Sequence, residues 1–468
     1  SRRRHTRLGR WSRGLGDVYK RQVYFGIFAN AVTLGWIIKA VWIISAVVAP
    51  EINRHLLIGA ILLITLAYTA ASGLWGIAAT DLIQFLIGSI GSITLGVLAW
   101  NHIGGIENII AGFVSRYGAD PAAGRLSFFP TIGTPFFVTF LVFITLKWWG
   151  KPPPAITQRI ISAKDEKHAS FATMLFSVVA FGLNYWPMIL VAMVSLVVYP
   201  DLKVPEAGYA MLILKLIPTG FLGLMLASLI AAFMSTVDTH INFGASYMVN
   251  DLYRRFIMKQ ASEKHYVRAS QISTVLMLLL AVAIAYNLDS VSEAWYYISM
   301  LTAGYGIVIV VRWFWWRVNA WAEIAALASS GIGSTLLSPK FGKAAGYWDH
   351  IPQLDWQYRF LIVVAFCTIT WITVCLLTKP TSEEHLKKFC AKVKPFPTLW
   401  GPIFKKYPEL DWNPHFTRSC INWALGAATV YCFCFGIGHL MFLNFTYGFL
   451  LLTLATVMAI TIYVIWRS

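Results

Sequence analysis

The sequence contains few charged residues: Asp, Glu, Lys and Arg together make up 13% of its 468 residues. A soluble domain usually carries about 25%. Hydrophobic residues make up 57% of the chain, and the mean hydropathy is +0.63. A chain this apolar needs a bilayer as its solvent. The composition therefore excludes a disordered chain and a collagen, and it argues against a soluble globular enzyme.

The sequence also lacks the motifs of common catalytic and metal sites. Its six cysteines form no Cys-x-x-Cys pair and no Cys/His spacing typical of zinc. It has no phosphate-cradling glycine loop, no His-Glu-x-x-His pattern and no nucleophile elbow. We therefore expect no enzymatic activity, no catalytic residues and no cofactor-binding motif.

Residues 1–22 differ from the rest of the chain because they are basic and have no apolar periodicity. They contribute +7 of the formal net charge of +17, from eight basic residues and Asp17. They lack the apolar core of a signal peptide. We interpret them as a non-native or disordered basic segment, with a nucleic-acid-binding arm as the alternative, and we predict no nucleic-acid partner.

Apolar windows of about twenty residues recur along the remaining chain and predict about twelve membrane spans. The windows are 23–49, 55–74, 76–101, 132–150, 169–199, 209–245, 268–288, 292–311, 318–338, 358–378, 420–442 and 446–466. Alternate connections carry about three times as many Lys and Arg residues as the others, and the positive-inside rule makes the richer set cytoplasmic. The C-terminus is then cytoplasmic, and the long polar stretch 382–419 is expected to be a solvated cytoplasmic linker.

The apolar segment 218–256 contains a polar stripe. Its members Ser235, Asp238, Thr239 and Asn242 follow the spacing i, i+3, i+4, i+7 and share one helix face. Hydroxyl and carboxylate oxygens suit a hard cation. A Ser or Thr in this helix also competes for the carbonyl one turn back, such as that of Ala232. The alternative is a helix–helix seam joined by polar side chains, although a seam rarely needs an acid.

Asp81 is the second acidic residue in an apolar span, with Gln84 one turn later. A charged group at the bilayer centre costs about 2.5–3.5 kcal/mol, so it needs a partner, an ion or a wet cavity. Asp81 is interpreted as a partner of a cation or of a buried base, or as a residue that reaches water. Pro187 marks a kink in the span 169–199. His240 lies on a different face from Asp238 and is read as structural.

Three stretches resemble the sodium/solute symporter family. Residues 217–256 carry a Pro-x-Gly entry, an Ala-Ser-x-x-Ala-Ala run, a Met-Ser-Thr core and an Asn-Asp-x-Tyr-Arg-Arg exit. Residues 68–87 are similar to the hairpin between the fourth and fifth core helices of that family, with Thr-Asp-x-x-Gln. Residues 155–169 are similar to its Gln-Arg…Ala-Lys cytoplasmic loop. The resemblance covers most of 23–320.

The resemblance implies an all-α integral membrane protein with a LeuT-like inverted repeat of five plus five helices and extra C-terminal helices. Counting back from the matched helices makes 23–49 the third core helix, so the chain is expected to be an N-terminally incomplete member. Residues 23–320 are then the transporter core and 321–468 are peripheral helices with the cytoplasmic loop 379–419. Because the broken first core helix would be missing, the fragment is not expected to transport.

The resemblance also implies cation ligands. Ala232, through its carbonyl, and Ser235 and Thr236, through their hydroxyls, match the main sodium site of the family. Asp81, Ser235, Asp238 and Thr239 match a second sodium site, with Asp238 in a place where hydroxyl residues are usual. Ser299, Thr302 and Tyr305 lie near the expected solute region, but no solute-binding residue is matched.

The predicted function is a sodium-coupled symporter that imports a small organic solute across the cell membrane. Sodium is the coupling ion, the lipid bilayer and the solute are the partners, and the sequence predicts no oligomeric state. Two alternatives remain open on the same helices: a proton-coupled transporter that uses Asp81 or Asp238 as its relay, and a membrane enzyme or sensor.

Overall fold

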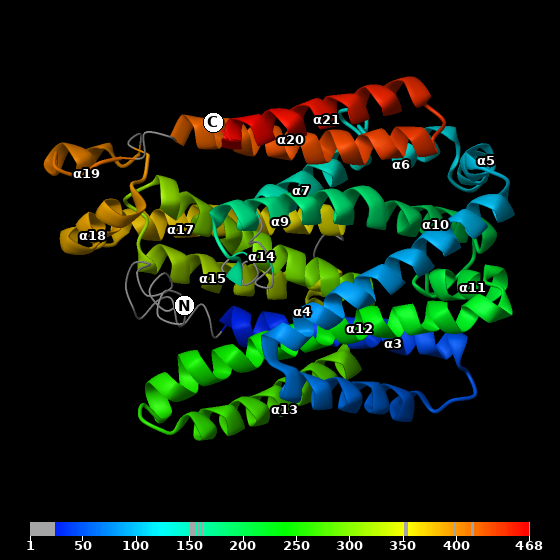
Figure 1. The fold of residues 1–468 in the computed structure, drawn as a ribbon, viewed down its shortest axis with the longest axis horizontal. Coiled ribbons are helices and arrows are strands. Elements are labelled where there is room, and N and C mark those ends of the chain that lie inside the picture. The colour runs from blue at the N-terminus through cyan, green and yellow to red at the C-terminus, as the bar shows by residue number, and fades with distance from the viewer. Residues whose placement is uncertain are drawn as a thin grey trace. The chain divides into compact units, whose positions relative to one another are not determined.

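The computed structural model is entirely helical in the part of the chain that it describes (Figure 1). The described residues are 24–149, 156, 160, 162–350, 354–396, 399–412 and 416–467. The predicted basic segment 1–22 lies outside them. The chain divides into two compact units, which are described separately: unit 1 comprises 1–36, 132–154 and 241–416, and unit 2 comprises 37–131, 155–240 and 417–468.

Unit 1 is built around three packed helices, α14, α15 and α17. Buried side chains such as Leu301, Ala322 and Trp371 form their common core. Its elements are η1 (Tyr24–Ala29), the start of α3 (Asn30–Val48), α7 (Pro135–Trp149), the end of α12 (Thr219–Tyr247), η3 (Met248–Ile257), α13 (Glu263–Asn287), α14 (Val291–Phe314), α15 (Ala320–Leu336), α16 (Pro339–Ala344), η4 (Trp348–His350), α17 (Trp356–Leu377), α18 (Glu383–Val393) and α19 (Gly401–Lys406).

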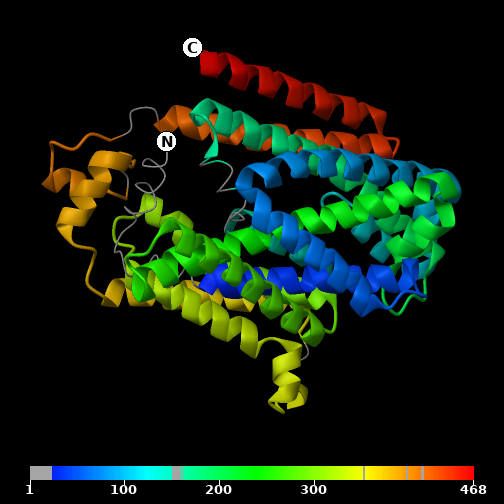
Figure 2. The ribbon, with the colours of Figure 1, turned by 60° about the horizontal axis from the view of Figure 1, so that its bottom comes forward.

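Unit 2 has its own core, in which Leu95, Ile109, Val191 and Ile213 are buried. Figures 1 and 2 show its last two helices, α20 and α21, lying side by side. Its elements are the rest of α3 and of α12, α4 (Arg54–Ile103), α5 (Ile106–Tyr117), α6 (Ala119–Leu126), α9 (Glu166–Ser177), η2 (Val178–Asn184), α10 (Tyr185–Val198), α11 (Ala207–Leu216), α20 (Phe416–Met441) and α21 (Phe445–Arg467).

Nine helices in the described residues are long and apolar enough to cross a membrane, compared with about twelve predicted spans. The windows without a candidate span of their own are 55–74, 132–150 and 318–338, which fall in α4, α7 and α15. The window 209–245 was wrongly predicted as one span. Pro218 separates α11 from α12 because proline lacks an N–H and disfavours the helical conformation of the residue before it.

The windows 55–74 and 76–101 belong to one continuous helix, α4, of 50 residues. A straight helix of that length spans about 75 Å, more than twice the hydrocarbon core of a bilayer. Figure 1 shows that α4 changes direction between two arms. The intervening sequence has alanines, which continue a helix, and the pair Ser72–Gly73, a combination common at kinks. The predicted hairpin is therefore a bent helix.

Near Pro187, where the sequence predicts a kink, the structure shows a change of helix type. The wider turns of the π-helix η2 run directly into α10, where Pro187 is the third residue. A proline near the start of a helical segment lacks the N–H that would bond one turn back. The π-turn absorbs that irregularity without ending the span, which runs from Glu166 to Val198.

The stretch 382–419 is more ordered than the predicted solvated linker. Helices α18 and α19 bury Leu386, Cys390, Trp400 and Ile403 together, and Figure 2 shows the two helices close to each other. The indole N–H of Trp400 donates to the carbonyl of Trp313 at 3.0 Å, which attaches this pair of helices to the end of α14.

Glu383 joins the two short helices. Its carboxylate accepts from the Lys406 ammonium at 2.5 Å and from the Tyr407 hydroxyl at 2.7 Å. These hydrogen bonds, that from Lys406 first, hold the pKa of Glu383 below its usual value. A lowered pKa stabilises the folded form above the unfolded pKa, which is about 4.3 for Glu, and that stabilisation is lost as the pH falls through the lower folded value.

We predict that Glu383→Gln exposes Cys390, and that acidification below about pH 4.3 does the same in the unchanged protein. The measurement is the rate at which a pyridyl disulfide labels Cys390 in a background where the exposed Cys420 is replaced by Ser. Glu384→Gln is the control, because Glu384 pairs only locally with Lys388 in the contacts described. Equal labelling rates in the two Glu variants would contradict the prediction.

Candidate cation site

The helix that carries the polar stripe, α12, begins directly after Pro218. The Pro218 carbonyl accepts from the N–H groups of Phe221 and Leu222, at 2.8 and 3.0 Å, and so starts the helix. The helix and the π-helix η3 together form a candidate span from Thr219 to Ile257. The stripe therefore lies in the middle of a long apolar element, as the sequence predicted.

Two of the predicted ligands from distant parts of the chain meet directly. The Ser235 hydroxyl of α12 donates to Oδ1 of Asp81 on α4. Both residues are half-buried and both belong to unit 2. The contact joins positions that are 154 residues apart. The structure thus brings together two of the residues singled out in the sequence.

The same two helices also approach closely at a glycine further along. A Cβ added to Gly91 would lie 2.9 Å from Sδ of Met225 and 2.9 Å from Oγ of Ser228. Moving forward from Asp81 to Gly91 on α4 corresponds to moving backward from Ser235 to Ser228 on α12. The helices are therefore antiparallel here, and the glycine permits their close approach.

The remaining predicted ligands pair along α12 itself. The Thr236 hydroxyl donates to the Ala232 carbonyl at 2.9 Å, and the Thr239 hydroxyl lies 3.3 Å from Oδ1 of Asp238. Asp238 is completely buried. The sequence indicated that a hydroxyl would compete for the Ala232 carbonyl, and Thr236 is the residue that does so.

Gln84 belongs to this region, although the sequence argument did not include it among the ligands. It lies one turn after Asp81 on α4, and the antiparallel register puts it at the level of Ala232. Its Oε1 is buried and has no hydrogen-bond partner among the described residues. The clue in the sequence was an amide side chain one turn after an acid in an apolar span. It could be interpreted only once the pairing of α4 with α12 was known.

The structure joins the predicted ligands in separate pairs: Asp81 meets Ser235 across α4 and α12, whereas Thr236 with Ala232 and Thr239 with Asp238 pair along α12. Hard oxygen donors of these kinds suit hard cations rather than soft transition metals. A serine hydroxyl that donates its proton to a carboxylate still has lone pairs for a cation. The described ranges contain no group of three or more His, Cys, Asp or Glu side chains that could hold a metal ion.

The residues near the expected solute region belong to α14 in unit 1. Ser299 and Tyr305 are buried in the helix packing, and the Thr302 hydroxyl donates to the Ile298 carbonyl at 2.9 Å. They form part of the core of unit 1. Their placement assigns them no role in binding.

Comparison with known proteins is decisive for the family. The sodium:solute symporter family profile matches residues 27–333. The chain belongs to the sodium:solute symporter family. It is therefore a multi-pass membrane protein, in agreement with the nine apolar helices found among the described residues.

Curated relatives of the chain agree with this assignment. Solute carrier family 5 member 4B of Mus musculus is 26% identical over 396 residues, which cover 73% of this chain and 59% of that protein. Sodium/glucose cotransporter 1 of Oryctolagus cuniculus is 25% identical, over 70% of this chain and 57% of its own. The human sodium/myo-inositol cotransporter 2 is 25% identical, over 72% and 57%. The chain thus spans about three fifths of the length of these relatives, two of which are named as sodium cotransporters.

A solved structure confirms the predicted fold. The outward-open, substrate-bound structure of a Na+-coupled sialic acid symporter superposes with a TM-score of 0.60, at 18% identity, over 78% of this chain and 75% of that one. The architecture is the LeuT-like transporter fold.

We predict that Gly91→Leu lowers the melting temperature of the purified protein. The added side chain would overlap with Met225 and Ser228 and push α4 away from α12. Overpacking of this kind costs about 1–3 kcal/mol. Gly88→Leu is a matched control, since a Cβ at Gly88 meets no atom within 4 Å. Melting temperatures that fall equally in both variants would show that helix approach at Gly91 is unimportant.

Proposed function

We propose that this protein is a sodium-coupled symporter that brings a small organic solute across the plasma membrane. The observation that carries the proposal is the contact between Asp81 and Ser235, an acid and a hydroxyl from two apolar helices in a family of symporters. A charged carboxylate in a membrane-spanning helix is costly unless it serves an ion. The names of the relatives refer to sodium with glucose or myo-inositol, but the solute of this chain remains unassigned.

Within the proposal, the coupling sodium is held by the oxygens of α4 and α12. Asp81 and Asp238 supply negative charge, Ser235, Thr236 and Thr239 supply hydroxyls, and Ala232 supplies a carbonyl. Gln84 adds its buried amide oxygen, which has no partner among the described residues. Because these donors sit on two antiparallel helices, sodium would stabilise the register between them.

The membrane potential supplies the energy for uptake. Each sodium ion that moves inward gains about 2.3 kcal/mol per 100 mV, and a tenfold concentration gradient adds about 1.4 kcal/mol. No covalent chemistry is required of the protein. Solute binding and release follow from alternating access, in which helices rearrange around a site near the bilayer midplane.

The orientation follows from the charges of the connections. The loops rich in Lys and Arg, including 379–419, are placed on the cytoplasmic side with the C-terminus. Residues 23–320 are proposed as the transport core and 321–468 as peripheral helices. The folded pair α18 and α19 is then a cytoplasmic feature.

The competing proposal is a proton-coupled transporter on the same fold. It is favoured by the hydrogen bond between Ser235 and Asp81, because a carboxylate that is partly buried in a span can hold a proton. A membrane sensor without transport is the other alternative. Both alternatives predict that sodium does not bind at the site and does not change the stability of the protein.

We predict that sodium raises the melting temperature of the purified protein relative to choline, and that Asp81→Asn increases the sodium concentration needed at least about tenfold. Asparagine keeps an acceptor for Ser235 but removes the charge. Asp201→Asn, at an exposed position in unit 2, is the control. Equal melting temperatures in sodium and in choline would contradict sodium coupling, and a melting temperature that depends on pH in the unchanged protein but not in Asp81→Asn would favour protons.

We predict that Gln84→Leu weakens sodium binding by about tenfold while leaving the melting temperature in choline nearly unchanged or raised. The substitution removes a buried oxygen that has no described partner, so only the cation loses an interaction. The same sodium titration measures the effect, with Gln271→Leu as the control at an exposed position of α13. An unchanged sodium titration would remove Gln84 from the site.

A further inference from the structure

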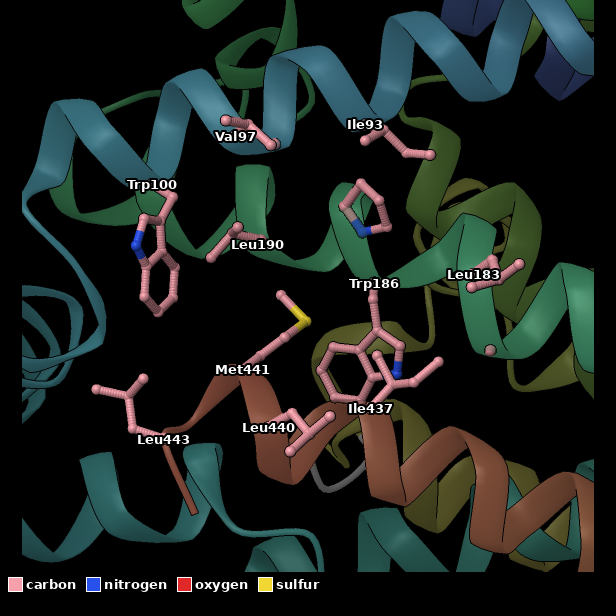
Figure 3. Close-up of a pocket in the computed structure, with 13 residues that line it drawn as sticks. Ile93, Val97, Trp100, Leu183, Trp186, Leu190, Ile437, Leu440, Met441 and Leu443 are labelled. Atoms are coloured by element: carbon pink, nitrogen blue, oxygen red, sulfur yellow. The ribbon is translucent and has the colours of Figure 1, made fainter. Parts of the chain in front are cut away.

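A cavity of about 430 Å³ lies within unit 2, between the second arm of α4, the start of α10 and the end of α20. Its volume is in the range of small-molecule sites. Figure 3 shows Trp100, Trp186, Leu190 and Met441 around the open space. Every lining side chain is apolar or an indole, and none of them belongs to the candidate cation site.

The polar atom of one indole in the wall is already used. Nε1 of Trp186 donates to the Cys434 carbonyl on α20 at 3.0 Å, so this ring presents hydrocarbon to the cavity. A water molecule in a cavity needs two to four polar partners. Apart from the indole N–H of Trp100, the lining side chains have no polar atom left to offer, so the cavity suits hydrocarbon better than water.

Close contacts at two glycines set the separation of the cavity walls. A Cβ added to Gly96 on α4 would lie 3.1 Å from Cβ of Pro187 on α10, and one added to Gly182 would lie 2.3 Å from the ring atom Cδ1 of Phe433 on α20. The helices are therefore already packed at these two glycines. Close-packed groups do not compress, so the helices do not close over the cavity by moving together.

The cavity opens toward the lipid. Val97 and Leu183 in its wall are 54% and 50% exposed, on helices that are candidate membrane spans. At one end lie Trp100, near the C-terminus of α4, and Leu443, just after α20. Tryptophan near the end of a span marks the membrane interface. A hydrocarbon chain is what surrounds such an opening in a bilayer.

We propose that this cavity binds an acyl chain of a membrane phospholipid, which enters from the interface beside Trp100 and extends toward Gly182. The bound chain packs against the same arm of α4 that carries Asp81. A lipid tail is thereby part of the wall of unit 2, and protein stability depends on it.

The test uses the purified full chain in phosphatidylcholine nanodiscs that contain a phosphatidylcholine with a diazirine in the middle of its acyl chain. After illumination, mass spectrometry is expected to find lipid adducts on peptides that contain 93–100, 186–190 and 437–443. Val97→Trp fills the cavity and is expected to reduce these adducts at least fivefold. Ile90→Trp is the matched control, because Ile90 is 55% exposed on the same helix but does not line the cavity.

Adducts that are equally strong in the unchanged protein and in Val97→Trp would overturn the proposal, since they would report lipid surrounding the whole protein. A diazirine sterol that labels these peptides and is displaced by Val97→Trp, when the phospholipid is not, would overturn it in favour of a sterol. If Val97→Trp does not fold, Ile93→Trp fills the same space from a position that is 47% exposed.

Discussion

The contact between Asp81 and Ser235 is the constraint on which the candidate site depends. A carboxylate in an apolar helix has to be satisfied, and the hydroxyl of α12 satisfies it in part. That single contact sets the register of α4 against α12. The register then brings Gly91 against Ser228 and leaves Gln84 level with Ala232. The polar contact and the close packing of α4 against α12 therefore depend on the same register between the two helices.

Small residues determine how the apolar helices approach one another. In a bilayer no hydrophobic force draws helices together, so close backbone packing has to supply the attraction. Gly91 supplies it between α4 and α12, and Gly96 between α4 and α10. The π-helix η2 and Pro187 add local irregularity to α10, and the apolar cavity lies where these deviations from regular packing meet.

The segment 382–419 is stabilised differently from the apolar helices. It is polar enough to lie in water, yet Trp400 and Cys390 are completely buried between its two short helices. A core this small is marginal alone, so the hydrogen bond from Trp400 to the end of α14 and the bridge from Glu383 to Lys406 hold it in place. Its folding depends on the helix to which it is attached.

The sequence by itself determined the class of protein, because nearly continuous apolar windows leave only a membrane as solvent. It also located Asp81, Ser235 and Asp238, since polar groups in such windows stand out against their surroundings. Its single span 209–245 and its separate spans 55–74 and 76–101 were wrong, because hydropathy does not report that Pro218 separates two helices or that α4 is continuous between the two windows.

Only the tertiary structure decided which polar residues meet. The spacing of a single helix places Ser235 and Asp238 on one face, but it says nothing about a partner 154 residues away. Gln84 acquired meaning only through the register of two antiparallel helices, and the lipid-facing cavity only through three helices of unit 2. Residues distant in sequence become neighbours through packing, and packing is a property of the assembled helices.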